Sequence, residues 1–176
     1  MSRLLFPDNT VLCNFAAVHR MPLLRDFLRG DGRWTQAVFA EARRSSDFLP
    51  ALSELLSAQW LGEPIEVVDN GIERIRRVVF GGTPSEPTRH LGEAETCHLI
   101  LEHEDYAGAA WITDDRDAYE YAQGKGIQTM DTLYILMALV SDGDLTPEMA
   151  HDLQNAMVDV DRSLLRTFGK PDDFRR

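Results

Sequence analysis

The chain has 176 residues and a formal net charge of −11, and 44% of its residues are hydrophobic. This length suits one domain with a small appendage, and the hydrophobic content is high enough for a packed core, which excludes a disordered chain. The negative balance argues against a general nucleic-acid coat protein, because such proteins are basic overall. A local cationic patch beside an acidic pocket is compatible with this balance.

The sequence predicts secondary-structure elements from apolar periodicity and from turn residues. In chain order these are a strand at 3–6, helices at 11–18, 34–46 and 47–61, a strand at 63–69, a helix at 71–80, a loop at 81–92, a helix at 93–104, a strand at 107–113, a helix at 117–126, a strand at 127–130, and helices at 132–143 and 146–168. Strands that alternate with helices predict an α/β fold with a parallel sheet and helices on both of its faces.

Three features bear on the cellular compartment of the protein. Cys13 and Cys97 show no metal-binding spacing and lie in apolar stretches, so we expect buried, reduced thiols. The longest purely apolar run, residues 133–140, is far shorter than the roughly 20 residues of a membrane span. The N-terminal segment does not have the pattern of a signal peptide. We therefore expect a soluble, cytoplasmic protein that does not associate with a membrane.

Carboxylates gather where the first and third predicted strands end. Asp8 follows the first strand, and Asp114, Asp115 and Asp117 follow the third. Sites in open parallel sheets form beyond the carboxyl ends of the strands, so both acidic turns can open onto one crevice. Clustered carboxylates repel one another unless they share protons or hold a cation. A hard divalent ion such as Mg²⁺ or Mn²⁺ suits oxygen ligands, and beside a phosphodiester it can activate water and neutralise the leaving oxygen.

Four stretches, taken in order, resemble a PIN domain. They are "FPDNTVLCNFA", "AVFAE", "LGEAETCHLILE" and "WITDDRDAYEYAQGKGIQTMDTLYIL". The chain is most similar to the branch with a Gly-Glu-Ala-Glu helix start and an Asp-Asp turn. The resemblance implies a three-layer α/β/α sandwich, with a central parallel sheet of four or five strands, over residues 1–140. Residues 141–176 are then a C-terminal helical extension packed on the same domain.

The resemblance also implies a set of site residues. The acids that it assigns to catalysis are Asp8, Glu41, Glu93 and Asp115. The acids that it assigns to the metal are Asp8, Glu93, Asp115 and, as an auxiliary ligand, Asp117. The auxiliary polar residues beside them are Thr10, Asn14, Thr113 and Asp114. The extra acid Asp131, where many relatives have glycine, either joins the metal site or adds repulsion.

Simpler interpretations of these acids are open at this stage. Asp8 and Asp117 could cap helices, and Glu93 could only complement a helix dipole, which is worth a few tenths to about 1 kcal/mol. Glu95 stands two positions beyond Glu93 and should point elsewhere on the helix. The arginines Arg76, Arg89 and Arg116 are predicted to form an RNA-binding rim, although a solvated helix face is the alternative.

The leading hypothesis is a Mg²⁺- or Mn²⁺-dependent endoribonuclease, because PIN domains are metal-dependent nucleases and many bacterial ones are toxins of toxin–antitoxin pairs. The expected partners are then an RNA substrate, a cognate antitoxin and a second copy in a homodimer. One alternative is a PIN-like binding or regulatory module with weak catalysis. A second is a haloacid-dehalogenase-like phosphatase, in whose mechanism Glu41 and Glu93 would have no role.

Overall fold

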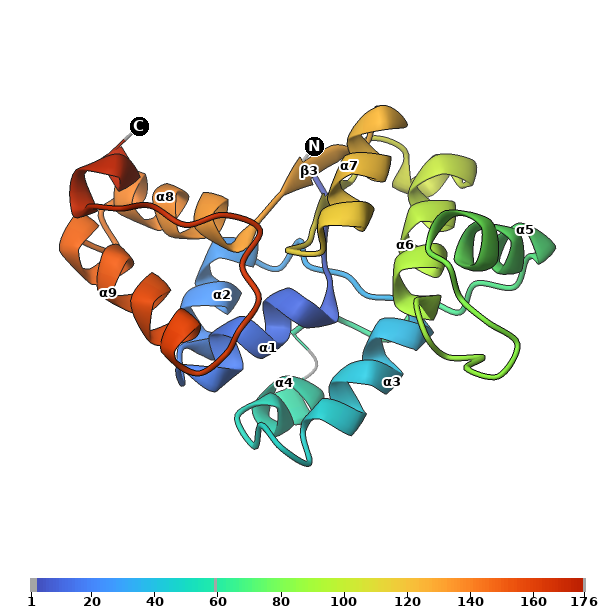
Figure 1. Cartoon of the computed structure of the whole chain (residues 1–176), viewed down its shortest axis with the longest axis horizontal. Coiled ribbons are helices and arrows are strands. Elements are labelled where there is room, and N and C mark those ends of the chain that lie inside the picture. Colours follow the sequence, from blue (N-terminus) through green and yellow to red (C-terminus); the bar gives the residue numbers. More distant parts are fainter. Residues whose placement is uncertain (1–2, 59, 176) are drawn as a thin grey trace.

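The computed structural model describes residues 3–58 and 60–175. Within these residues, short strands form a parallel sheet at the centre of the molecule, and helices cover both of its faces (Figure 1). The strands are β1 (Leu5–Pro7), β2 (Ala110–Ile112) and β3 (Gln128–Met130), in that order across the sheet. The fold is therefore the α/β sandwich that the alternating pattern predicts.

The helices mostly follow the predicted elements. The α-helices are α1 (Asn9–Ala17), α2 (Met21–Leu28), α3 (Gln36–Ser45), α4 (Leu52–Ala58), α5 (Asn70–Arg74), α6 (Leu91–Glu102), α7 (Arg116–Gly124), α8 (Thr132–Asp142) and α9 (Pro147–Asp159). The shorter helical turns are η1 (Ile75–Val79), η2 (Glu104–Tyr106) and η3 (Pro171–Arg175). Of the elements in the described residues, α2 and η3 have no counterpart among those predicted, although the buried Met21, Leu24 and Leu28 of α2 recur at helical spacing.

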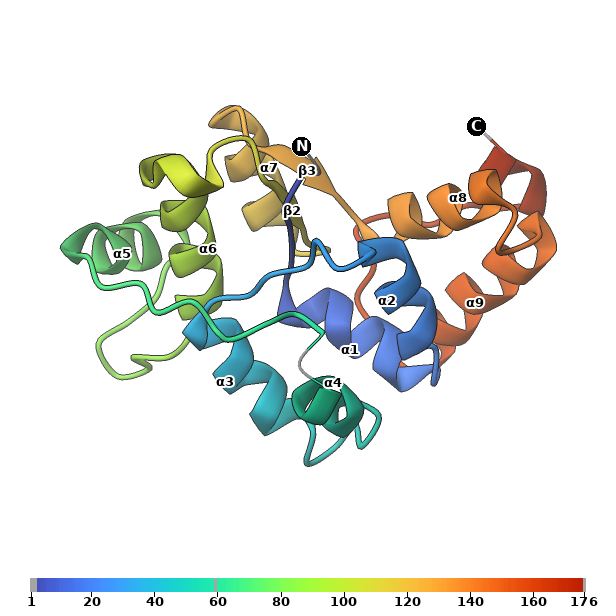
Figure 2. The same cartoon turned by 180° about the vertical axis from the view of Figure 1, so that it is seen from behind.

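The two faces of the sheet belong to two hydrophobic cores. Successive side chains of a strand point to opposite faces, and in β2 Ala110 and Ile112 enter one core while Trp111 enters the other. The first core contains α1, α2, α8 and α9, and the second contains α6 and α7. In Figure 2, α6 and α7 accordingly lie on one side of the strands, and α1, α2 and α8 lie on the other.

The sheet has fewer regular strands than the four or five expected, and the predicted strand at 63–69 is wrong. In that segment Ile65 pairs with Thr35 in one isolated parallel bridge, and the chain before Thr35 touches β1 through a bridge between Gly32 and Leu5. Pro64 has no backbone N–H to donate, which prevents the ladder from continuing through it. The sheet therefore continues past β1 only as irregular chain.

The last helix is shorter than the predicted helix at 146–168. It begins as predicted, with Thr146 as its N-cap, and ends at Asp159. Asp161 then adopts a positive φ of 56° and turns the chain. Residues 160–170, called the return segment below, run back toward the middle of the molecule before η3 packs against α8 and α9 (Figure 1).

The return segment is held by a side chain of α9. Gln154 is buried; its Oε1 accepts a hydrogen bond from the Phe168 amide at 2.6 Å, and its Nε2 donates to the Phe168 carbonyl at 3.0 Å. The Phe168 ring packs edge-on against Phe174 of η3, with 4.9 Å between ring centroids. Phe174 in turn belongs to the core that also contains α1 and α8, so the C-terminal region packs on the same body.

Two further expectations concern thiols and membranes. The thiols of Cys13 and Cys97 are free and buried, as predicted, and burial raises the pKa of Cys97 to about 12. In the described residues, none of the helices is both long enough and apolar enough to cross a bilayer.

The Gln154 contacts predict a stability effect. Gln154→Ala should lower the free energy of unfolding by about 1–3 kcal/mol, because it leaves two backbone groups of Phe168 without their partners. For a domain of this size, that loss corresponds to a melting temperature lower by several degrees. Thermal denaturation measures it, and Asp152→Ala on the exposed side of the same helix is the matched control. Equal melting temperatures for the two variants would contradict the role given to Gln154.

Candidate functional site

The register of the sheet brings the strand-following polar residues to one edge. Pro7 pairs with Ile112, and Ile112 pairs with Met130, so the three strands end at the same level. The next residue after β1 is Asp8, and its amide donates to the Ile112 carbonyl at 2.8 Å. The next residue after β2 is Thr113, and its amide donates to the Met130 carbonyl at 3.0 Å. The two acidic turns therefore lie side by side, as the sequence predicts for a parallel sheet.

Asp8 is buried and fixed by hydrogen bonds. Its Oδ1 accepts from the Asn9 amide at 2.8 Å, which caps α1. Its Oδ2 accepts from the hydroxyls of Thr10 at 2.8 Å and Thr113 at 3.3 Å. The Thr113 hydroxyl also accepts from the Asp115 amide at 3.1 Å, so it links the two acids. Asp8 is thus a helix cap as well as a member of the acidic group, and both hydroxyls lie beside it where the resemblance places them.

Adjacent acids in the Asp-Asp turn have different surroundings. Asp115 is half-buried and caps α7, where its Oδ1 accepts from the Ala118 amide at 2.8 Å. Its charge is close enough to raise the pKa of both Asp8 and Glu93. Asp114 is turned away from this group and is buried, as expected for neighbours whose side chains alternate.

Glu41 and Glu93 reach the same region from two helices that pack together, α3 and α6. The Gly92 amide donates to Glu41 Oε1 at 3.3 Å. A Cβ atom added at Gly92 would lie 3.0 Å from the same oxygen, so the absence of a side chain lets the carboxylate approach the start of α6. Glu93 follows directly, and its Oε1 lies 3.4 Å from His90 Nδ1.

The charges of these acids act on one another. Burial, and then the charges of Glu93 and Asp115, raise the pKa of Asp8 to about 7. Burial, and then the charges of Asp8 and Glu93, raise the pKa of Glu41 to about 8. Burial and the charge of Asp115 also raise the pKa of Glu93. The structure therefore brings together all four acids that were assigned to catalysis.

Positive charge compensates this acidic group only in part, because the guanidinium of Arg44 lowers the pKa of Glu41 without forming an ion pair with it. Among the described residues, none of Asp8, Glu41 and Glu93 forms an ion pair with lysine or arginine. Carboxylate and hydroxyl oxygens with unbalanced negative charge are the donor set that a hard divalent cation prefers. Nevertheless, no three His, Cys, Asp or Glu side chains of residues 3–58 and 60–175 are arranged as a ready-made metal cage. Like charges repel when no cation draws them together, so an open arrangement is the physical expectation for the acids alone.

Asp114 and Asn14 form a separate, buried network. Asp114 accepts hydrogen bonds from Asn14 Nδ2 at 2.9 Å, from the Thr132 hydroxyl and from the Leu165 amide at 3.1 Å. Asn14 Nδ2 also lies 3.0 Å from the Ser163 carbonyl. Burial raises the pKa of Asp114 to about 6, although these hydrogen bonds act against it. The network ties α1 and α8 to the return segment, which is a structural role.

Two other acids, Asp131 and Glu95, are explained by local contacts. Asp131 caps α8 through a 2.7 Å bond from the Tyr134 amide and pairs with Arg166 of the return segment, so its charge is balanced. Glu95 accepts from the Ala37 amide at 2.9 Å at the start of α3 and points away from Glu93, as predicted. Asp117 is exposed in the first turn of α7, and its role as a metal ligand stays a prediction.

The prediction that Arg76 contacts RNA is wrong, because Arg76 is buried. Its guanidinium pairs with Glu73 at 2.8 Å and donates to the carbonyls of Thr83, Glu86 and Arg89 at 3.0–3.3 Å. A guanidinium has five N–H donors, and this one donates to Glu73 of α5 and to carbonyls of the chain between η1 and α6. Arg76 therefore shapes the loop at 81–90, called the wall loop below.

The other two rim arginines are exposed. Arg89 forms a surface ion pair with Glu86 at 3.1 Å, and its Nε donates to His90 at 3.2 Å. Arg116 begins α7 and donates to the Leu165 carbonyl at 3.3 Å. Exposed pairs of this kind are weak, so both side chains can exchange these contacts for a phosphate.

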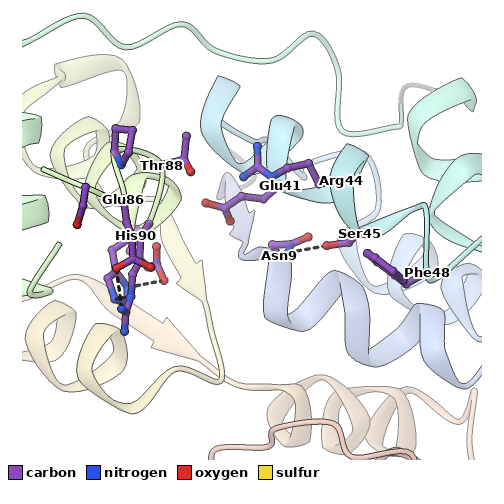
Figure 3. Close-up of a pocket in the computed structure, with 12 residues that line it drawn as sticks. Asn9, Glu41, Arg44, Ser45, Phe48, Glu86, Thr88 and His90 are labelled. Atoms are coloured by element: carbon purple, nitrogen blue, oxygen red, sulfur yellow. Dashed lines mark hydrogen bonds and ion pairs between the residues drawn. The ribbon is translucent and has the colours of Figure 1, made fainter. Parts of the chain in front are cut away.

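A groove of about 650 Å³ lies between α3 and the wall loop and reaches Glu41 and Glu93 (Figure 3). Its lining is mixed polar and aromatic: Asn9, Glu41, Arg44, Ser45, Phe48, Ser85, Glu86, Pro87, Thr88, Arg89, His90 and Glu93. Sequence reasoning missed Arg44, Ser45 and Phe48 as candidate site residues. Phe48 in particular has an apolar side chain that a sequence pattern assigns to the core, whereas it is 85% exposed.

A family model described as a PIN domain matches residues 6–166 of the chain. The match includes all four acids of the group and extends into the return segment. No curated protein and no solved structure shows a significant match.

The unbalanced charge predicts how stability depends on pH in the metal-free protein. The raised pKa of Glu41 means that the folded chain holds this proton more tightly than the unfolded chain. Its stabilising contribution is complete below pH 4.5 and is lost as the pH rises through about 8. Glu41→Gln removes the charge, so it should raise the melting temperature above that pH by a few degrees and have less effect at lower pH.

Melting curves in a metal chelator, measured across this pH range, test the prediction. Glu54→Gln on the exposed surface of α4 makes the same chemical change outside the acidic group and serves as the control. If the melting temperatures of Glu41→Gln and wild type depended on pH in the same way, the pKa of Glu41 would not be raised in the folded protein.

Proposed function

Because this chain belongs to the PIN domain family, we propose that it is an endoribonuclease that depends on Mg²⁺ or Mn²⁺. PIN domains are generally nucleases that use divalent metals. The finer proposal, RNA as the substrate, follows from the ribonucleases that make up most of the family.

One observation carries the proposal: burial and neighbouring acids raise the pKa of Asp8, Glu41 and Glu93, which come from separate elements, and in the described residues none of the three forms an ion pair with lysine or arginine. Structural carboxylates at the same sheet edge are compensated by the protein itself. Asp131 pairs with Arg166, and Asp114 accepts hydrogen bonds from Asn14 and from the Leu165 amide. The contrast within one edge supports a ligand of positive charge at the unbalanced group.

The residues of the chain have distinct tasks in this proposal. Asp8, Glu93 and Asp115 would hold the ion, and Glu41 would hold the ion or orient the attacking water. When bound, the ion lowers the pKa of water and neutralises charge on the leaving oxygen. Thr10 and Thr113 donate to Asp8 and keep its carboxylate oriented, a support on which ligand geometry depends.

A binding module with weak catalysis is the second candidate. It is favoured by the open arrangement of the acids, since within the described residues no ready-made cage is present. The partners would then matter more than the chemistry. We propose a cognate antitoxin whose cationic segment enters the acidic groove, and a homodimer, as the partners of either form.

Metal binding predicts a change in thermal stability. Mn²⁺ should raise the melting temperature of the wild type, because an ion that binds only the folded state stabilises it. The rise should be larger at pH 8 than at pH 6, because the ion must displace protons from acids with raised pKa values. Asp115→Asn should remove most of this rise in melting temperature, whereas Asp26→Asn, at an exposed position of α2, should not. No metal-induced rise in wild type would favour the binding module.

Catalysis is tested by cleavage of a labelled single-stranded RNA with Mn²⁺. Asp8→Asn should reduce the rate by more than about 100-fold, because loss of even an outer partner of a metal site costs 10- to 100-fold. Asp26→Asn, purified in parallel, should cleave at the wild-type rate. Equal rates for Asp8→Asn and wild type would reveal a contaminating nuclease and remove the support for the proposal.

A further inference from the structure

The groove beside the acids contains an aromatic ring that no packing requirement explains. Phe48 follows the end of α3 and is 85% exposed, although its neighbour in the chain, Leu49, packs on the core. An exposed ring of this size forgoes the stabilisation that its burial would contribute. Phe48 lines the same groove as Glu41 (Figure 3).

Cationic side chains flank the groove. Arg44 lies one helical turn before Phe48, and its charge is close enough to Glu41 to lower the pKa of that carboxyl. In the part of the chain that the structure describes, no carboxylate forms an ion pair with Arg44. Across the groove, Arg89 extends from the wall loop, where an exposed ion pair with Glu86 and a hydrogen bond to His90 hold it.

We propose that Phe48, Arg44 and Arg89 form a subsite for one nucleotide of single-stranded RNA, adjacent to the acidic group. The base stacks on the Phe48 ring, and the arginines hold the flanking phosphates so that a phosphodiester lies beside Glu41 and Glu93. This subsite rests on the proposed function, because it positions the substrate of the same site.

Three physical features select this occupant. An exposed aromatic platform with cationic neighbours is how proteins hold single strands without reading sequence. The groove volume of about 650 Å³ lies within the range of pockets that hold small organic ligands. A base in a duplex is already stacked on its neighbours, so only an unpaired base can use the Phe48 ring.

The position of the subsite explains how a protein with a negative net charge can bind RNA, which is also negatively charged. A net charge of −11 repels RNA, and the acids of the groove repel a phosphate most strongly. Arg44 and Arg89 provide local attraction at the rim, where phosphates would otherwise meet Glu41, Glu86 and Glu93. RNA binding is therefore expected to need these arginines more than a basic protein would need any single one.

The test measures binding separately from cleavage. Every protein carries Asp8→Asn, and the fluorescence anisotropy of a labelled short oligoadenylate is followed in a fixed low concentration of Mg²⁺. Phe48→Ala should weaken binding about 5- to 100-fold, the usual effect of losing one stacked base, and Phe48→Tyr should restore it. Tyr134→Ala, which removes another exposed ring on α8, is the matched control and should bind normally.

The arginines are distinguished by salt dependence. Arg44→Gln should weaken binding and reduce the slope of log K against log salt by about 0.7, the effect of one phosphate contact in a single strand. Phe48→Ala should leave that slope unchanged, because stacking releases no counterion. Arg43→Gln, on the same helix and exposed but outside the groove, should change neither quantity.

Two results would overturn the subsite. The first is equal affinity of the Phe48→Ala and Tyr134→Ala proteins for the oligoadenylate. The second is a Phe48→Ala protein that binds as tightly as the Asp8→Asn parent and does not distinguish single-stranded from duplex RNA. Either result leaves metal-dependent cleavage intact if the wild type cuts RNA. Conversely, binding that depends on Phe48 in a protein that never cleaves RNA would support the subsite and reject the nuclease.

Discussion

The level ends of three parallel strands are the constraint on which the site depends. Pro7, Ile112 and Met130 stand in register, so the residue that follows each strand emerges at the same edge of the sheet. Asp8 and the Asp-Asp turn consequently become neighbours although more than a hundred residues separate them in the chain. A slip in the register of β1 would move Asp8 along the strand direction, away from this edge, and separate it from Asp115.

The acids at this edge fall into two groups that differ in how far the protein compensates their negative charge. Asp131 has Arg166, and Asp114 has several hydrogen-bond donors, so these two stabilise the fold. Asp8 is buried and Glu41 and Glu93 are half-buried, and the pKa values of all three are raised by burial and by neighbouring acids. Proteins retain unfavourable charge of this kind where function requires it, which separates the candidate metal ligands from the structural carboxylates.

The surroundings of the site are built by side chains that do not enter it. Arg76 holds the carbonyls of the wall loop and so shapes one side of the groove. Gln154 holds the return segment, whose backbone in turn contacts Asn14 and Asp114. Gly92 leaves room for the Glu41 carboxylate. Each of these residues acts through position. Gly92 belongs to the Gly-Glu-Ala-Glu motif, whereas no sequence pattern marks the structural roles of Arg76 and Gln154.

The sequence by itself determined the fold class and most of the helices, because apolar periodicity and caps are local signals. The family resemblance singled out the four acids, and their catalytic role stays a prediction. It did not determine that Arg76 is buried, that residues 63–69 pair only at Ile65, or that the last helix ends at Asp159. Those outcomes depend on which segments meet in space. The tertiary structure also decided which of the adjacent acids Asp114 and Asp115 joins the group, because neighbouring side chains are distinguished only by what packs against each of them.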